Sequence, residues 1–323
     1  MTTSQKCDNP SCPQAAAASP ISSNNLRLCS RCRATRYCSQ ECQRACWPSH
    51  KRQCRRQNYI IKFQLCPEDI ADPPVERTLS CPADAPFYLL HLALQTAFGW
   101  ATTHSFDFAI RDPDYRPPTD IADFLRNRLV YRRDGGGADR PREYLLRVVD
   151  PVPQSPFSGI DRMHEGSRQH PGTVEKKSSE WRLWQLLDDR QYQGKQLLYT
   201  YDFGDNWEHV STVEGRAEAT DHFVCLSGTG HPVAEDAGGV AGWNDLKAAY
   251  RAERPTAEQR ERRTWFETLA SNADPAGLAG DRVHAWDKAQ VNRNLENLLE
   301  RFGQIAEQAA SQKAMFEQIT GRS

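Results

Sequence analysis

Beyond residue 56 the apolar positions first alternate as in β-strands and then follow a helical stripe. The runs NYIIKFQLCP and VERTLSCP predict two strands at the start of this region. Apolar residues at helical spacing come next: Phe87, Leu90, Leu94 and Phe98. The stripe stops at Gly99, a residue type that commonly ends helices, and HSFDFAI (104–110) alternates again like a half-buried strand.

Residues 111–180 interrupt this periodic pattern. They contain PDYRPPTD, RRDGGGADRPR and a polar stretch from 154 to 179, and only EYLLRVVD (143–150) has the pattern of a strand. We therefore expect a loop insertion that is carried by a folded domain and contains no chemistry.

A strand–turn–strand pattern reappears at GKQLLYTYDFGDNWEHVSTVE (194–214), with its turn at GDN. A Gly-Gly turn and a helix that contains Trp243 come next, and long polar helices are predicted over 257–270 and 291–320. These elements predict an α+β fold in which a larger mixed sheet-and-helix domain at 59–300 precedes a C-terminal helical tail at 301–323.

The composition describes a chain of about two domains. Charged residues make up 26% and hydrophobic residues 38%, and no stretch approaches the ~18 apolar residues of a membrane helix. The first residues, MTTSQKCDNP, have no apolar run behind a basic start, so no signal peptide is expected. Eight of the eleven cysteines lie before position 55, which favours thiolates held by metal in a reducing compartment. We expect an intracellular protein, nuclear or cytoplasmic, without membrane contact.

Metal-ligand residues fill the first 54 positions in close pairs. The eight residues are Cys7, Cys12, Cys29, Cys32, Cys38, Cys42, His50 and Cys54. Their spacing is C-x4-C, C-x2-C, C-x3-C and H-x3-C, and such pairs suit tetrahedral zinc because one tight turn supplies two ligands. Eight ligands make two closed sites with no open position for a substrate. The segment 1–58 is therefore predicted to be a small module in which two Zn²⁺ ions support the structure.

The same segment resembles a MYND-type zinc finger over residues 7–54. The resemblance rests on C-x2-C from Cys29, followed by YC-x3-CQ-x3-W-x2-H-x3-C from Tyr37. It implies a cross-brace with interleaved ligands: Cys7, Cys12, Cys38 and Cys42 on one zinc, and Cys29, Cys32, His50 and Cys54 on the other. The sequence departs from the family in its C-x4-C first pair and in the long loop that follows this pair.

Two further residues of the finger carry expectations. Cys46 stands outside the ligand pattern and is interpreted as a free thiol. Pro48 is expected to open a second short helix, where its missing N–H has no cost.

The resemblance also implies a function, because MYND fingers are interaction domains that bind proline-containing peptides. The contacts would come from Ser30, Gln43 and Trp47. An indole face packs on a proline ring, while hydroxyl and amide groups bond an extended backbone that makes no internal hydrogen bonds. The alternative is that Trp47 only covers the second zinc site.

Charge is divided unevenly between the two parts of the chain. Residues 1–58 contain ten Lys or Arg and two Asp or Glu, whereas the remainder contains 31 and 40. A basic finger could bind nucleic acid or an acidic partner. The basic side chains concerned are Arg31, Arg33, Arg36, Arg44, Lys51, Arg52, Arg55 and Arg56. The alternative is that they balance the negative charge of zinc bound by three or four thiolates.

Carboxylates and one histidine gather at the predicted hairpin and at the turn after it. The candidate residues of this second-domain site are Asp202, Asp205, His209, Glu235 and Asp236. Converging carboxylates and imidazole could hold a divalent metal ion or perform acid–base chemistry.

A purely structural role is the alternative for these residues. Asp205 would form the turn, Gly204 would supply a positive φ angle and Asp202 would cap local backbone. Glu235 and Asp236 would cap the helix that follows.

The same blocks resemble the Ri-plasmid ORF-three-like domain, also described as an insertion-element passenger of TnpR-like type. The resemblance rests on YTYDFGDNWEHVSTVE, CLSGTG and EDAGGVAGW, and upstream on FYLLHLALQTAFGW and THSFDF. It covers about residues 59–300, apart from the insertion at 111–180. It implies an α+β domain with no established activity, and we assign no catalytic residue.

The favoured function is a zinc-binding protein-interaction protein whose finger recruits a proline-containing partner peptide. A nucleic-acid-associated regulator that uses the basic finger is one alternative. A metal-dependent enzyme that uses the acidic hairpin is the other, and an enzyme is the less expected outcome.

Overall fold

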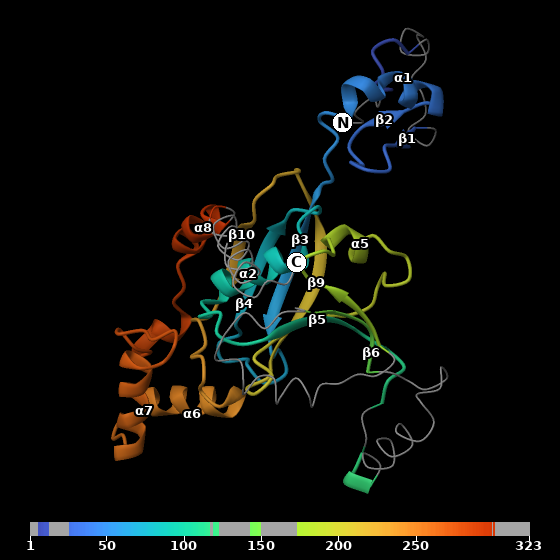
Figure 1. Cartoon of the computed structure of the whole chain (residues 1–323). Coiled ribbons are helices and arrows are strands. Elements are labelled where there is room, and N and C mark those ends of the chain that lie inside the picture. The colour runs from blue at the N-terminus through green and yellow to red at the C-terminus, as the bar shows by residue number, and fades with distance from the viewer. Residues whose placement is uncertain are drawn as a thin grey trace, which may run out of the picture.

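The molecule combines a small finger with a larger body of sheet and helices (Figure 1), in agreement with the predicted α+β class. The structure is a computed structural model and describes residues 6–12, 26–116, 119–122, 143–149, 173–298 and 300. The predicted tail at 301–323 and most of the polar stretch at 154–179 lie outside the described residues. No helix in the described part of the chain is long and apolar enough to cross a membrane.

One eight-stranded sheet forms the centre of the body. Its strands are β3 (Asn58–Leu65), β4 (Glu76–Cys81), β5 (Phe106–Arg111), β6 (Tyr144–Val149), β7 (Val174–Lys177), β8 (Leu197–Tyr201), β9 (Trp207–Ala217) and β10 (Val224–Thr229). Their order across the sheet is β10-β4-β3-β9-β8-β5-β6-β7, and every pairing is antiparallel except that of β6 with β7. Strands far apart in sequence thus become neighbours, and β5 lies beside β8.

Strand β3 shows how the apolar alternation builds this sheet. Tyr59 and Ile61 are buried, and Ile61 lies in register with Leu79 of β4 and Val213 of β9. Side chains alternate between the two faces of a strand, so every second residue of β3 enters the core. The strands predicted from NYIIKFQLCP, VERTLSCP, HSFDFAI, EYLLRVVD and the hairpin at 194–214 are all present.

Helix α2 (Phe87–Phe98) lies across the sheet, as the apolar stripe predicts (Figure 1). Phe87 packs on Phe108 of β5 with 5.0 Å between the ring centroids. Gly99 ends the helix in the left-handed conformation with φ 76°, and a Cβ at this position would lie 2.9 Å from the Cβ of Pro232. Both the backbone angle and the close approach favour glycine here.

The other helices of the body are α5 (Leu183–Leu187), α6 (Gly239–Arg251), α7 (Ala257–Thr268), the 3-10 helix Gly280–His284 and α8 (Lys288–Glu296). Trp243 is buried in α6, the helix predicted after the Gly-Gly turn. Helix α7 begins at a capping box in which Thr256 and Gln259 bond each other's backbone N–H. Helix α8 overlaps the first residues of the helix predicted over 291–320 and ends at Glu296; residues 301–320 of that prediction lie outside the described residues.

Two strands carry no clear signal in the sequence. Strand β7 reads VEKK, is exposed at all four positions and lies parallel to β6 at one edge of the sheet. It falls in the stretch predicted to be a loop insertion, so that prediction was wrong for residues 174–177. Strand β10 pairs with β4 at the other edge, and a bulge between Cys225 and Ser227 breaks its alternation.

The finger is built from one short ribbon and one helix. These are β1 (Arg27–Leu28), β2 (Arg36–Tyr37) and α1 (Gln40–His50). Ser39 caps α1 by accepting a hydrogen bond from the backbone N–H of Cys42 at 3.2 Å. Pro48 does not open a second helix, which corrects the prediction; it lies in the last turn of α1. The helix ends two residues later, so little helix beyond the proline is disturbed.

Asp188, which directly follows α5, joins the finger to the body. Its carboxylate forms ion pairs with Arg33 of the finger at 4.0 Å, with Arg56 of the linker at 3.8 Å, and with Arg216 of β9. The guanidinium of Arg56 also lies 4.0 Å from the centre of the Trp184 ring. We call Asp188 and its three arginines the Asp188 clasp. Figure 1 places α5 at the end of the body that faces the finger.

Candidate functional site

The eight predicted ligands of the finger form two interleaved clusters. One contains Cys7, Cys12, Cys38 and Cys42, and the other contains Cys29, Cys32, His50 and Cys54. Within each cluster the ligand atoms lie within 4.8 Å of one another. This is the interleaved division that the MYND resemblance implies. The pair Cys29 and Cys32 of the second cluster lies in sequence between the two pairs of the first cluster.

The spacing of the ligand atoms fits tetrahedral zinc. Sulfur atoms bound to one zinc at the usual ~2.3 Å are about 3.8 Å apart, and a sulfur and an imidazole nitrogen are about 3.6 Å apart. In the first cluster, Sγ of Cys38 lies 3.4 Å from Sγ of Cys12 and 3.5 Å from Sγ of Cys42. In the second, Sγ of Cys32 lies 3.6 Å from Nε2 of His50. The finger therefore binds two structural zinc ions, one at each cluster.

His50 is oriented by a residue that the sequence pattern did not reveal. Its Nδ1 lies 3.3 Å from the hydroxyl of Thr35. With Nε2 as the metal ligand, Nδ1 carries the proton and donates it to Thr35 Oγ1, which fixes the ring. Thr35 lies three residues after Cys32, at a position with no ligand character of its own.

The C-x4-C pair is accommodated by a local turn. The backbone N–H of Cys12 donates to the carbonyl of Asn9 at 3.0 Å, and the Asn9 side chain accepts from the N–H of Ser11 at 3.1 Å. This turn absorbs the two additional residues of the pair. Cys46 belongs to neither cluster, since its buried Sγ lies 3.9 Å from the carbonyl of Asp8 and 3.8 Å from Ser49 Oγ.

Two of the three predicted partner-binding residues, Ser30 and Trp47, adjoin the second cluster. Ser30 is exposed in the turn between the ligands Cys29 and Cys32. Trp47 is 39% exposed, and its ring lies edge-on to the ligand His50 with 5.9 Å between centroids. Gln43 is half-buried one helical turn before Trp47, so both side chains lie on one side of α1.

Not all of the basic residues of the finger region are available to an external ligand. Arg33 and Arg56 form ion pairs with Asp188 in the clasp. Arg56 also pairs with Asp84 of the body at 3.6 Å. Part of the positive charge expected to attract nucleic acid is therefore neutralised by the acidic body.

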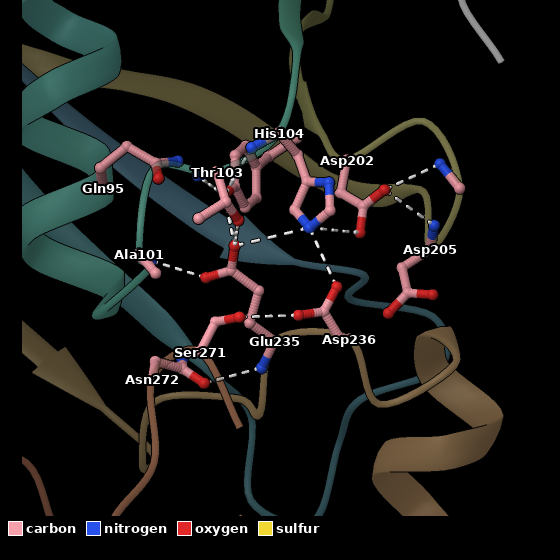
Figure 2. A network of polar contacts seen from close by, with 12 residues as sticks. Gln95, Ala101, Thr103, His104, Asp202, Asp205, Glu235, Asp236, Ser271 and Asn272 are labelled. Atoms are coloured by element: carbon pink, nitrogen blue, oxygen red, sulfur yellow. Dashed lines mark hydrogen bonds and ion pairs between the residues drawn. The ribbon is translucent and has the colours of Figure 1, made fainter. Parts of the chain in front are cut away.

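A second polar cluster lies in the body, where β5 begins and β8 ends (Figure 2). Phe106 of β5 lies in register with Tyr201 of β8. This pairing places His104, two residues before β5, near Asp202, which directly follows β8. Asp236 completes the cluster from the loop before α6, and the ligand-type atoms of the three residues lie within 4.8 Å of one another.

His104 is the centre of this cluster. Its Nε2 lies 3.0 Å from Oδ1 of Asp236, 3.7 Å from Oε1 of Glu235 and 3.8 Å from Oδ2 of Asp202. Figure 2 shows the imidazole directed between the three carboxylates. Sequence reasoning missed His104, because it belongs to the block THSFDF, whose alternation was interpreted only as a strand.

Glu235 is fully buried and bound by three donors. Its Oε2 accepts from the backbone N–H of Ala101 at 2.6 Å. Its Oε1 accepts from the hydroxyls of Thr103 and Tyr201, both at 2.6 Å. The prediction that Glu235 caps the next helix was wrong, because α6 begins after Gly238 without any side-chain cap.

Asp236 does not cap α6 either. One carboxylate oxygen pairs with His104, and the other accepts a hydrogen bond from Ser271 Oγ at 2.9 Å. Its backbone lies in the left-handed region with φ 62°. Aspartate tolerates this region better than most residues, and the bend turns its side chain toward His104 and away from the helix.

Asp202 caps local backbone, as the structural alternative predicts. Its Oδ1 accepts from the N–H groups of Gly204 at 2.9 Å and Asp205 at 3.3 Å. The positive φ angles of this turn belong to Asp202 and Asn206, both at 57°, so the assignment of positive φ to Gly204 was wrong. The Asp202 side chain is only 6% exposed, and this burial raises the pKa of its carboxyl group above the usual value.

Asp205 and His209 lie apart from the His104 cluster. Asp205 Oδ2 accepts from the N–H of Gly238 at 3.2 Å and supports the Gly-Gly turn. His209 is fully buried in β9, and its Nδ1–H points at the carbonyls of Tyr199 (3.2 Å) and Trp207 (3.1 Å). Burial lowers the pKa of His209 to about 3, so it is a neutral core residue. His209 packs among Phe98, Trp100 and Tyr199, and none of its described contacts is with the carboxylates it was predicted to join.

Two family models match the chain. Residues 6–54 match the MYND finger, a protein-interaction module. Residues 58–292 match the family of the plasmid pRiA4b ORF-3-like protein. The protein-binding role of the first part therefore follows from its family, while the second part matches a family without an assigned function.

Two individual relatives are each similar to part of the chain. The uncharacterized protein y4hQ of Sinorhizobium fredii is 26% identical over 180 residues, which cover 55% of this chain and 66% of y4hQ. The histone-lysine N-methyltransferase SMYD3 of Homo sapiens is 46% identical over 35 residues, which cover 11% of this chain and 8% of SMYD3. The chain thus spans less than two thirds of either relative.

Among solved structures, the protein of unknown function MM3350 from Methanosarcina mazei Go1 is similar, with 18% identity and a TM-score of 0.46. The similarity covers 72% of this chain and 96% of MM3350. The family match over residues 58–292 extends over more than half of the sequence. The chain is a member of the plasmid pRiA4b ORF-3-like family and carries a MYND finger ahead of the family domain.

Proposed function

We propose that this chain is a docking protein whose finger captures a proline-containing segment of a partner. The observation that carries the proposal is the exposure of Trp47 beside the second zinc cluster. A large aromatic ring exposed on a small module costs solubility and is a common anchor in protein interfaces. Ser30 supplies a polar group next to the same cluster, and Gln43 supplies one on the same side of α1 as Trp47.

The chemistry of these three residues suits a proline-rich ligand. The indole of Trp47 offers a flat apolar face for a pyrrolidine ring. A peptide in the polyproline II conformation leaves its carbonyls free, and the Ser30 hydroxyl and the Gln43 amide donate to such groups. The body then serves as a second recognition domain or as a scaffold for the finger.

The test compares capture of a proline-rich peptide library by the full-length protein and its Trp47→Ala variant. Loss of a central aromatic anchor commonly costs ~2 kcal/mol or more, so we expect at least about a 30-fold weaker affinity. Arg44→Ala is the matched control, because Arg44 is exposed on the same helix and lies outside the three predicted contacts.

Zinc content separates the two roles considered for Trp47. Under the proposal, Trp47→Ala retains two zinc ions and loses peptide affinity. If the variant loses the second zinc ion together with the peptide, Trp47 covers the metal instead. Capture that is unchanged in Trp47→Ala would end the peptide-groove proposal.

A further inference from the structure

We propose that His104, Asp202 and Asp236 form a binding site for a divalent transition-metal ion in the body. This site is separate from the two zinc clusters of the finger and does not rest on the peptide-docking proposal. One imidazole and two carboxylates make a mixed donor set that suits Mn²⁺, Fe²⁺ or Zn²⁺. The thiolate clusters of the finger suit Mn²⁺ and Fe²⁺ less well.

The arrangement of the donor atoms supports a shared ion. Ligand atoms at ~2.1 Å from one metal are about 3.0 Å apart at a right angle and somewhat further apart at wider angles. Nε2 of His104 lies 3.0 Å from Oδ1 of Asp236 and 3.8 Å from Oδ2 of Asp202. All three atoms lie within 4.8 Å of one another.

Among the described residues, the cluster brings together more negative than positive charge. Asp202, Glu235 and Asp236 bring three carboxylates to one imidazole, and His104 is their sole ion-pair partner within the described ranges. A protonated His104 would neutralise one of three negative charges. A divalent cation removes more of this excess, in a place where burial makes uncompensated charge expensive.

One carboxylate oxygen of the largely buried Asp202 side chain faces His104. The Asp202 side chain is 6% exposed, and its Oδ1 is occupied by the N–H groups of Gly204 and Asp205. Its Oδ2 accepts no hydrogen bond from any described residue; the nearest charged group is Nε2 of His104 at 3.8 Å. Figure 2 shows this oxygen facing His104, as a metal ligand would. A carboxylate oxygen that faces the cluster without such a hydrogen bond is available as a metal ligand.

A rigid outer layer positions the donors. Tyr201 donates to Glu235, and the Tyr201 hydroxyl also accepts the backbone N–H groups of Thr103 at 3.0 Å and His104 at 3.3 Å. Ser271 fixes the second oxygen of Asp236. Such second-layer bonds orient metal ligands in known sites. The Asp236 side chain is 45% exposed, which leaves the cluster open to an ion from solvent.

The experiment uses the full-length protein with its finger zincs in place, titrated with Mn²⁺ and followed by the electron paramagnetic resonance signal of free Mn²⁺. Thiolate-rich clusters keep zinc in the presence of Mn²⁺, so the finger does not contribute. We expect one bound Mn²⁺ per chain. Saturation with zinc in place of Mn²⁺ should give three zinc ions per chain by elemental analysis, and not two.

Three variants locate the site. Asp202→Asn keeps an oxygen for the local turn and removes a ligand charge, and His104→Gln removes the imidazole; each should weaken Mn²⁺ binding at least about ten-fold. Asp205→Asn is the matched control, because it removes a neighbouring negative charge and keeps an oxygen for the Gly238 N–H. It should bind Mn²⁺ within about two-fold of wild type.

Two results would overturn the proposal. One is a wild-type protein that binds no Mn²⁺ and holds two zinc ions at saturation. The other is equal weakening of Mn²⁺ binding by Asp205→Asn and Asp202→Asn, which would mean that the ion is attracted by the negative charge of the region and not by specific ligands. Since His104→Gln and Asp202→Asn change different elements, misfolding of one variant still leaves the other to decide. Peptide capture through Trp47 should be unaffected in all three.

Discussion

The hydroxyl of Tyr201 donates a hydrogen bond to the buried carboxylate of Glu235 over 2.6 Å, which ties the end of β8 to the loop before α6. The same hydroxyl accepts the backbone N–H groups of Thr103 and His104. One side-chain oxygen thus joins three segments that are far apart in sequence.

Tyr201→Phe should therefore destabilise the body by ~1–3 kcal/mol, because Glu235 loses a donor and two N–H groups lose their acceptor. Urea unfolding followed by tryptophan fluorescence measures this, since seven of the eight tryptophans lie beyond residue 58. Tyr192→Phe is the control and should shift the free energy of unfolding by less than about 0.5 kcal/mol. Equal stability of Tyr201→Phe and wild type would contradict the role given to this hydroxyl.

Zinc stoichiometry distinguishes ligand from non-ligand cysteines in the finger. Cys12→Ser removes one of the four ligands of the first cluster, so the purified variant should hold fewer zinc ions than wild type. Cys46→Ser changes a buried thiol that belongs to neither cluster and should retain the wild-type content. Elemental analysis of both proteins gives the answer, and zinc loss in Cys46→Ser would show that Cys46 is a ligand.

Acid should destabilise the body through His209. Burial lowers the pKa of folded His209 to about 3, whereas an unfolded histidine titrates near ~6.5. Below the pKa of the unfolded state, His209 binds a proton in the unfolded chain and stays neutral in the folded chain. The free energy of unfolding therefore falls as the pH falls from ~6.5 toward 3, by up to about 1.4 kcal/mol per pH unit.

His209→Phe isolates this contribution, since phenylalanine fits the aromatic surroundings of the ring and does not titrate. Between pH 6 and pH 4, the free energy of unfolding should fall less steeply in the variant than in wild type. His91 is also buried with a pKa of about 3, but it is present in both proteins and cancels from the difference. Parallel pH profiles would mean that His209 is not neutral in the fold.

The Asp188 clasp should control the mobility of the finger more than its stability. Asp188→Asn weakens three ion pairs at once, yet partly exposed pairs each contribute only ~0–1 kcal/mol, so the unfolding transition should move little. Nitrogen-15 relaxation should instead show the finger tumbling more independently of the body. Asp189→Asn removes the neighbouring charge, which makes no ion pair with a described residue, and should leave the relaxation of the finger unchanged.

Local patterns in the sequence predicted the elements that depend on local physics. The alternation in β3 and the stripe of α2 each bury a complete face, and Gly99 stops the helix as expected. The zinc clusters were predictable for a similar reason, because ligand pairs must lie close in sequence to share a turn.

The His104 cluster could not be predicted in the same way. Its members come from three segments, and only the pairing of β5 with β8 brings His104 to Asp202. In the sequence, His209 within β9 and His104 just before β5 both stand in alternating segments, and the pattern does not show which of them faces the core. Strand β7 was missed because a single exposed valine followed by three charged residues gives no alternating apolar signal, and the strand forms by pairing with β6.

The Asp188 clasp also has a mechanical consequence. A finger on a free linker would sweep through a wide volume, and anything it held would meet the body at random orientations. The carboxylate of Asp188 forms ion pairs with the finger, the linker and β9, and these pairs restrict the motion of the finger relative to the body. The distance between a ligand on Trp47 and the carboxylates around His104 is then set by the fold and not by chain statistics.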